Sequence, residues 1–199
     1  HFTGDAFPFS QRPFESQSFV LPLNLEKNEM QTLYIELRSE GTLQLPAKLL
    51  SEADYNSTTM AFYIIQGIYF GVVGIMMFYN LVLFFALWAR EFLYYVLYAG
   101  MMMLVLSTLH GFNYQYLWPD AIWWNSKAIP IAISTGSFAF LLFTYHFLNI
   151  RHYSKKLANT NRVLTVIMGL TAALSFALPY SMAIKLAAAT SIISIFLCV

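Results

Sequence analysis

Residues 62–87 read FYIIQGIYFGVVGIMMFYNLVLFFAL, a run without one charged side chain. A helix that crosses a membrane needs about 20 mostly apolar residues. The charges nearest to this run are Asp54 before it and Arg90 after it, so the run is long enough to cross once. We therefore predict a first membrane-spanning helix over residues 62–87.

The spacing of the remaining charges predicts four further spans. They cover residues 93–112, 128–149, 163–179 and 181–199. In the whole chain of 199 residues, 58% are hydrophobic and 11% are charged, whereas ordinary soluble domains carry about 25% charged residues. A soluble protein of this size has too little polar surface to cover so many apolar runs. We expect residues 62–199 to form an integral membrane α-helical bundle whose partner is the lipid bilayer. Because the fifth run is still apolar at the last residue, we interpret the chain as a fragment.

Basic residues predict the orientation of the bundle, since they are enriched in cytoplasmic loops. The loop over residues 151–162 carries Arg151, Lys155, Lys156 and Arg162 and no acid. This loop is therefore expected in the cytoplasm. Counting back through the spans places residues 1–61 outside, in the periplasm of a bacterium, and the protein in the bacterial inner membrane.

Residues 1–61 differ from the rest in composition, with eight acids, four bases and a net charge of −4, against +5 for the remainder. Within residues 17–50, apolar and other side chains alternate with a period of two, which is typical of strands with one buried face. We predict that residues 1–50 are the C-terminal part of a periplasmic β-sandwich and that residues 51–61 are a linker. Three strands bury too little to stand alone, so we expect earlier strands to lie before His1.

Several motifs in order suggest a family. They are GDAFPFSQRP at 4–13, FVLPL at 19–23, LYIEL at 33–37, GIYFG at 67–71, MFYNL at 77–81, YYVLY at 94–98 and GFNYQYLWP at 111–119. The chain resembles the bacterial seven-transmembrane receptors with diverse intracellular signalling modules, in the subclass with a jelly-roll periplasmic domain. The resemblance implies an outer domain like a carbohydrate-binding module. It also implies seven helices that lead to a cytoplasmic output domain, either a diguanylate cyclase or a histidine kinase of a two-component system. Two helices and the output domain would lie outside these residues.

The residues themselves indicate no catalytic, cofactor or metal constellation. His110, His146 and His152 share no metal-ligand spacing, and Cys198 is the single cysteine. We expect no enzyme activity within this chain and no cofactor. A net charge of +1 also argues against nucleic acid as a partner, because phosphate binding needs a concentrated basic face.

The candidate ligand-binding residues lie on the predicted outer side. His110 sits beside Asn113 and Tyr114, where a proton- or ligand-sensing role competes with a purely structural one. The aromatic loop from Tyr114 to its tryptophans has three interpretations: anchoring at the membrane interface, stacking on a saccharide ligand, or docking of the sandwich. The tryptophans are Trp118, Trp123 and Trp124.

Helix packing is predicted at four residues of the first span. Gly67, Gly71 and Gly74 form one small-residue stripe, which lets another helix approach closely. Packing within the chain and a homodimer face both fit this stripe. Asn80 is an amide in the same span, and we expect a neighbouring helix to bind it, because an unpaired amide in hydrocarbon is costly.

A sensory receptor is the function that these observations favour. A small molecule or saccharide would bind the outer sandwich, and the short Ser51–Thr59 connection would pass the change to the first span. A transporter or channel with an external binding domain is the alternative, although the spans carry few of the polar residues that transport uses. An integral-membrane enzyme fits less well, because Glu91 and Asp120 are expected at opposite membrane faces.

Overall fold

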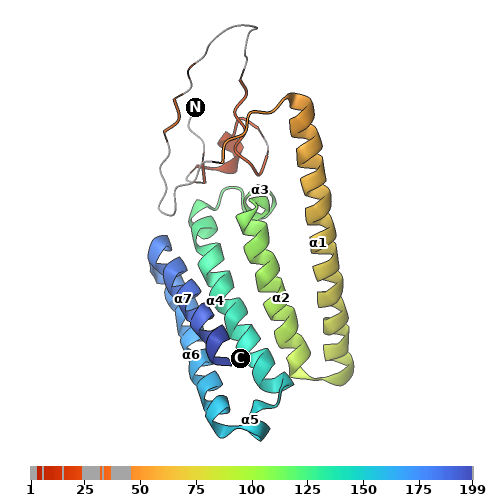
Figure 1. Ribbon diagram of the computed structural model, residues 1–199, viewed down its shortest axis with the longest axis vertical. Coiled ribbons are helices and arrows are strands. Elements are labelled where there is room, and N and C mark those ends of the chain that lie inside the picture. The colour runs from red at the N-terminus through yellow and green to blue at the C-terminus, as the bar shows by residue number, and fades with distance from the viewer. Residues whose placement is uncertain are drawn as a thin grey trace.

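The computed structural model describes residues 4, 5, 7–14, 16–23, 32, 34–36 and 46–198. Five long helices run up and down beside one another as a bundle (Figure 1). Each is long and apolar enough to cross a membrane, so the predicted membrane bundle is confirmed. The long helices are α1 (Glu52–Leu87), α2 (Arg90–Leu109), α4 (Ile122–Phe147), α6 (Lys155–Ala177) and α7 (Tyr180–Cys198). Three short elements accompany them: η1 (Phe9–Gln11), α3 (Phe112–Tyr116) and α5 (Ile150–Tyr153).

Helix α4 is the centre of the bundle, and α1 lies at its edge. Helix α4 packs against α2, α6 and α7, whereas α1 packs against α2 (Figure 1). The described residues around η1 lie over the end of the bundle at which α1 begins and α2 ends (Figure 1). We call this the docked end, and the other the opposite end.

The first helix begins ten residues before the predicted span, so the predicted linker over residues 51–61 is helical from Glu52 onward. Ser51 caps the helix, because its side chain accepts a hydrogen bond from the backbone N–H of Asp54 at 3.2 Å. Glu52 and Asp54 lie in the first turn, where acids favour the helix dipole. At 1.5 Å per residue the helix is about 54 Å long, well beyond the ~30 Å core of a bilayer. The helix is therefore longer than one crossing of a bilayer needs.

The other helices also differ from the predicted spans at their ends. Helix α4 begins at Ile122 rather than at 128, and α6 begins at Lys155 rather than at 163, so much of the predicted loop 151–162 is helical. Charged residues limit how much of a helix lies in hydrocarbon, but they do not end it. Helix α2 ends at Leu109 rather than 112, because Gly111 has a φ of 79° and turns the chain into α3.

Small side chains allow the helices of the core to pack closely. A Cβ at Gly136 of α4 would lie 3.1 Å from Cβ of Met101 in α2. Larger side chains fill the space between α4 and α6, where Leu141, Leu164 and Met168 are buried together. Lys127 is buried near the start of α4, and its Nζ donates to the carbonyl oxygen of Leu178 between α6 and α7.

The predicted β-sandwich is not visible in the described part of the chain. None of the described residues between 4 and 50 forms a strand. Many residues of the predicted strands, among them Leu25, Leu33, Leu37, Leu43 and Leu45, lie outside the described residues. The sandwich therefore stays a prediction.

Candidate functional site

The corner between α2 and α3 forms the floor of the candidate site. Gly111 makes the corner through its left-handed backbone. Asn113, which is 4% exposed, then fastens α3 back onto α2. Its Nδ2 donates to the carbonyl oxygen of Leu104 at 3.1 Å and to Oγ1 of Thr108 at 2.7 Å. Asn113 is thus a structural residue of the corner, bound within the chain.

The N-terminal segment lies on this corner. We call its described residues between 4 and 19 the docked segment. The hydroxyl of Tyr114, a residue only 1% exposed, donates to the carbonyl oxygen of Phe7. The backbone N–H of Phe9 donates to the carbonyl oxygen of Pro119 at 3.0 Å. The rings of Phe9 and Tyr114 meet edge to face with centroids 6.0 Å apart, so polar and aromatic contacts join the segment to α3 and the loop that follows it.

Arg12 holds the docked segment together. Its side chain is 4% exposed and pairs with Asp5 at 2.8 Å. Its Nη1 donates to the carbonyl oxygens of Ser16 at 2.9 Å and Gln17 at 3.1 Å. A buried guanidinium requires such partners, because leaving a charged donor unpaired in a dry site is costly.

Three aromatic rings surround the same guanidinium. The Arg12 Cζ atom lies 4.5 Å from the ring centroid of Phe19, 4.7 Å from that of Phe9 and 5.6 Å from that of Tyr114. All three separations are within the range of cation–π attraction. Arg12 therefore contacts both its own segment and the α3 side of the interface.

The first helix reaches the docked segment as well. The hydroxyl of Tyr55 donates to Oγ of Ser16 at 3.1 Å, and the hydroxyl of Tyr63 donates to Oε1 of Gln17. Both tyrosines lie near the start of α1. The docked segment thus bridges α1 on one side and α3 on the other.

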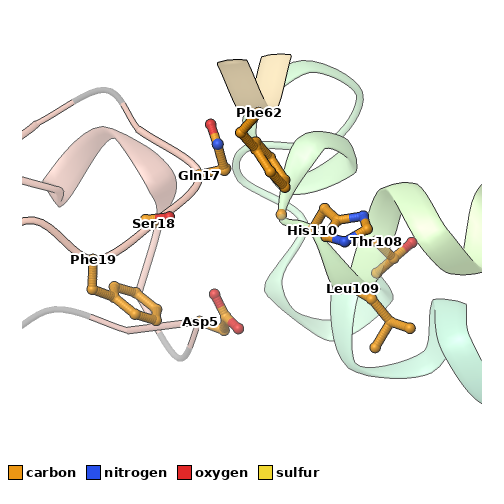
Figure 2. A pocket seen from close by; sticks show the side chains of 9 residues that line it. Asp5, Gln17, Ser18, Phe19, Phe62, Thr108, Leu109 and His110 are labelled. Carbon is orange, nitrogen blue, oxygen red and sulfur yellow. The ribbon is translucent and has the colours of Figure 1, made fainter. Parts of the chain in front are cut away.

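A partly open cavity of about 330 Å³ lies between the docked segment and the helix ends. Figure 2 shows Asp5, Ser18 and Phe19 on the segment side, facing Phe62 and His110 across the cavity. Its volume is at the lower end of the ~300–1,000 Å³ range of small-molecule sites. The full lining is Asp5, Gln17, Ser18, Phe19, Phe62, Thr108, Leu109, His110 and Gly111.

His110 lies at the cavity wall as the C-terminal cap of α2. Its ring packs against that of Phe62 in α1, with centroids 5.4 Å apart and an angle of 73°. Nδ1 is buried and has no hydrogen-bond partner among the described residues. The position beside the cavity keeps both predicted interpretations of His110 open.

Burial is the main influence on the ionisable groups of this site. It lowers the pKa of Arg12, and the nearby Asp5 carboxylate opposes that shift; an arginine so placed remains charged. Burial raises the pKa of Tyr114, and Asp5 and Asp120 act in the same direction against the effect of Arg12. The Tyr114 phenol is therefore held neutral, as the hydrogen bond that it donates requires.

The three predicted tryptophans form a separate group. Trp118 lies edge to face with Trp124, with centroids 6.2 Å apart, and its Nε1 donates to Oδ1 of Asn125 at 3.2 Å. Trp124 also packs on Phe176 of α6 at 6.3 Å, while Trp123 is 60% exposed. None of the three lines the cavity beside His110. Tyr114 therefore contacts the docked segment, whereas the three interpretations of the tryptophans stay predictions.

The glycine stripe of α1 has no neighbour within the described chain. A Cβ built at Gly67, Gly71 or Gly74 would meet nothing within 4 Å, so packing inside the described residues does not explain the stripe. The homodimer interpretation stays a prediction. Asn80 donates from Nδ2 to the carbonyl oxygen of Met76 at 2.8 Å, one turn earlier in α1. Its own helix thus supplies an acceptor among the described residues, and the expectation that a neighbouring helix binds this amide stays a prediction.

The opposite end of the bundle has a different character. Its cavity of about 420 Å³ is lined mainly by apolar residues such as Phe147, Leu157 and Leu197 and contains no charged side chain. Among the described residues, no group of three or more His, Cys, Asp or Glu side chains could hold a metal ion. The docked end is therefore the better candidate site.

Sequence reasoning identified His110, Asn113 and Tyr114 but missed Arg12 and the two tyrosines of α1. A signal was present for Arg12. The motifs GDAFPFSQRP at 4–13 and GFNYQYLWP at 111–119, both used for the family resemblance, are the two surfaces that meet at this interface. Their contact joins residues far apart in the sequence, and periodicity within one helix cannot reveal it.

Comparison with protein families gives two matches that divide the chain near this interface. A family model described as 7TM diverse intracellular signalling matches residues 62–199. A second, described as 7TMR-DISM extracellular 2, matches residues 1–51. Comparisons with curated proteins and with solved structures find no match. The docked segment lies within the second matched region, and α3 lies within the first.

Proposed function

The chain belongs to the 7TM diverse intracellular signalling family of membrane sensory receptors, and we propose that it senses a ligand on the periplasmic side of a bacterial inner membrane. The ligand would be a small molecule, with a saccharide as the expected class. The change would pass through the helices to a cytoplasmic output domain of the histidine kinase or diguanylate cyclase type.

One observation carries this proposal: described residues of the region that matches the extracellular family model are bound to the end of the helical bundle by specific polar contacts. Tyr114 and Pro119 make them on the α3 side, and Tyr55 and Tyr63 on the α1 side, while Arg12 lies over the ring of Tyr114. A ligand changes output only if it binds two conformations of the receptor with different affinity. An interface that depends on orientation is a suitable place for such a difference to reach the helices.

Three buried hydroxyls of the bundle support a receptor rather than the alternative of a transporter. Buried Ser134, Thr171 and Ser175 donate to carbonyl oxygens one turn earlier in their own helices, at 2.8 to 2.9 Å. Hydroxyls bound in this way support close helix packing. A transport route would need polar groups directed into a water-filled path.

Cysteine labelling tests the orientation in this proposal. In a background with Cys198→Ser, one variant carries Ser18→Cys and another Lys156→Cys; both native side chains are exposed. In intact spheroplasts a membrane-impermeant maleimide should label the first variant and not the second. Permeabilisation should then expose the second. Labelling of Lys156→Cys in intact spheroplasts would show that the topology is the reverse of the proposed one.

Thermal unfolding in lipid nanodiscs tests the ligand class. A saccharide that binds the folded chain should raise the unfolding temperature, since binding at 100 times Kd adds about 2.7 kcal/mol to stability. A panel of mono- and oligosaccharides should contain at least one compound with this effect. Amines and amino acids are measured in parallel. If some of these stabilise the chain and no saccharide does, the saccharide class is excluded.

A further inference from the structure

Helix α1 is held to the bundle differently at its two ends. At the opposite end, Trp88 and Ala89 join it directly to α2, and Trp88 adopts a left-handed φ of 51° that turns the chain sharply. Along its length α1 packs against α2, but none of its residues is buried and its glycine stripe faces open space. At the docked end, contacts with the docked segment add to this packing.

Two sets of contacts hold that end. Ring contacts connect α1 to the corner, among them Phe62 stacked on Phe112 with centroids 6.0 Å apart. Polar contacts connect α1 to the docked segment, through Tyr55 to Ser16 and Tyr63 to Gln17. The Tyr55–Ser16 contact lies nearer to the start of the helix than the Phe62 ring, so it acts farthest from the Trp88–Ala89 turn.

Arg12 connects these polar contacts to α3. It binds the carbonyl oxygens of Ser16 and Gln17, the two residues that α1 contacts. It also lies against the rings of Phe9 and Tyr114, which form the contact with α3. Removing Arg12 should therefore loosen both sides of the bridge together.

We propose that the docked segment is a strap, locked by Arg12, that holds the outer end of α1 against the α2–α3 corner. Releasing the strap lets α1 swing about the Trp88–Ala89 turn, and this swing is the motion that the receptor uses to pass a signal. The signalling meaning of the motion rests on the proposed function, whereas the motion itself can be measured without any ligand or output.

Pulsed EPR on the whole chain in nanodiscs measures this motion. In the Cys198→Ser background, Met60→Cys in α1 and Leu117→Cys after α3 carry spin labels; the two native side chains are 66% and 65% exposed. The chain with Arg12 should give one narrow distance distribution. Arg12→Ala should broaden it and raise the population of longer distances about tenfold, because charged hydrogen bonds are lost.

Two controls separate strap release from general disruption. A reference pair at the opposite end, Leu87→Cys and Tyr153→Cys, should keep its distribution in Arg12→Ala. Arg162→Ala should leave the Met60–Leu117 pair unchanged, although Arg162 also lies over a tyrosine ring, that of Tyr145 at 5.9 Å. An unchanged Met60–Leu117 distribution in Arg12→Ala would overturn the proposal, and so would an equal change in the reference pair.

Milder variants keep the proposal testable if Arg12→Ala does not fold. Tyr55→Phe removes the hydroxyl that reaches Ser16 and should give a smaller shift in the same direction. Gly111→Ala should disturb the same interface from the corner side, because its Cβ would lie 3.0 Å from the carbonyl oxygen and 3.1 Å from Cβ of Gln17 and because alanine is strained at a φ of 79°. If both leave the distances unchanged, the strap does not hold α1. If the strap opens but a full receptor signals unchanged in the same variants, the strap exists and its signalling role fails.

Discussion

At the scale of single residues, the interface depends on side chains that combine an apolar body with a polar end. Tyr114 is buried and still uses its hydroxyl on the docked segment. The charged guanidinium of Arg12 donates hydrogen bonds to one carboxylate and two carbonyl oxygens, and its flat face lies against aromatic rings. Such residues suit a surface at the edge of a membrane, where water and hydrocarbon are both close.

The titration of Tyr114 follows from its burial. Its pKa is raised above the ordinary value of 10.0, so the folded state favours the neutral phenol. The contribution of Tyr114 to folding is therefore complete below about pH 10 and is lost as the pH rises through its folded pKa. The difference between alkaline absorbance titrations of the chain and of Tyr114→Phe should show one phenol with a midpoint above 10. A midpoint at or below 10 would contradict the buried placement.

At the scale of elements, the sequence predicts the helices well and their ends poorly. The apolar runs correctly indicate five spans, because hydrocarbon excludes charge regardless of neighbours. The ends depend on local chemistry that charge spacing does not report. Ser51 caps α1 far outside the apolar run, and Gly111 ends α2 inside one. The candidate site is predicted in part, because His110, Asn113 and Tyr114 are close in sequence, whereas their contact with the docked segment spans about half of the chain.

Two glycines in helices of the bundle provide a matched test of packing. Alanine is the better helix former by about 1 kcal/mol at either position. At Gly71 a Cβ meets nothing within 4 Å, so Gly71→Ala should leave stability unchanged or raise it. At Gly136 a Cβ would lie 3.1 Å from that of Met101, and such overpacking costs about 1–3 kcal/mol. Unfolding in nanodiscs should therefore separate the two variants, with Gly136→Ala the less stable.

The opposite result at Gly71 would also be informative. If Gly71→Ala destabilises the chain as much as Gly136→Ala does, another helix must lie against the stripe in the membrane. Repeating the measurement at lower protein density in the bilayer would then show whether that helix comes from a second copy, since only a contact between copies weakens on dilution.

At the scale of the whole molecule, the structure changes how the outer region is connected to the helices. The sequence predicts a linker over residues 51–61, in which the short Ser51–Thr59 connection passes a change in the outer region to the first span. Instead, α1 is one continuous helix from Glu52 to Leu87, and residues of the docked segment contact it and α3 directly. Two routes therefore lead from the outer region to the bundle: the continuous chain and the docked interface.

Single-alanine insertions distinguish these routes. One alanine between Asn56 and Ser57 turns Tyr55 by about 100° around the axis of α1 relative to the rest of the helix, which removes it from Ser16. One alanine between Ala47 and Lys48 lengthens the chain equally, but at a place where the backbone is not helical.

Hydrogen exchange of the Phe9 amide reports docking, because this amide donates to the carbonyl oxygen of Pro119. We expect the helix insertion to speed exchange in residues 7–14 about tenfold, as the loss of roughly 1.4 kcal/mol of docking implies.

The loop insertion should leave that exchange unchanged, because the docked segment is held by its own contacts and not by tension in the connecting chain. If both insertions speed the hydrogen exchange equally, the connecting chain positions the docked segment. The continuous chain into α1 would then be the main route from the outer region to the bundle. If neither does, Tyr55 contributes little to docking, and the α3 contacts of Phe7 and Phe9 suffice alone. The expected split between the two insertions arises only if α1 is a rigid rod that continues from the membrane into the interface. An outer region that contacts a rigid helix can turn or tilt that helix in a defined direction. A flexible linker cannot pass on such a direction.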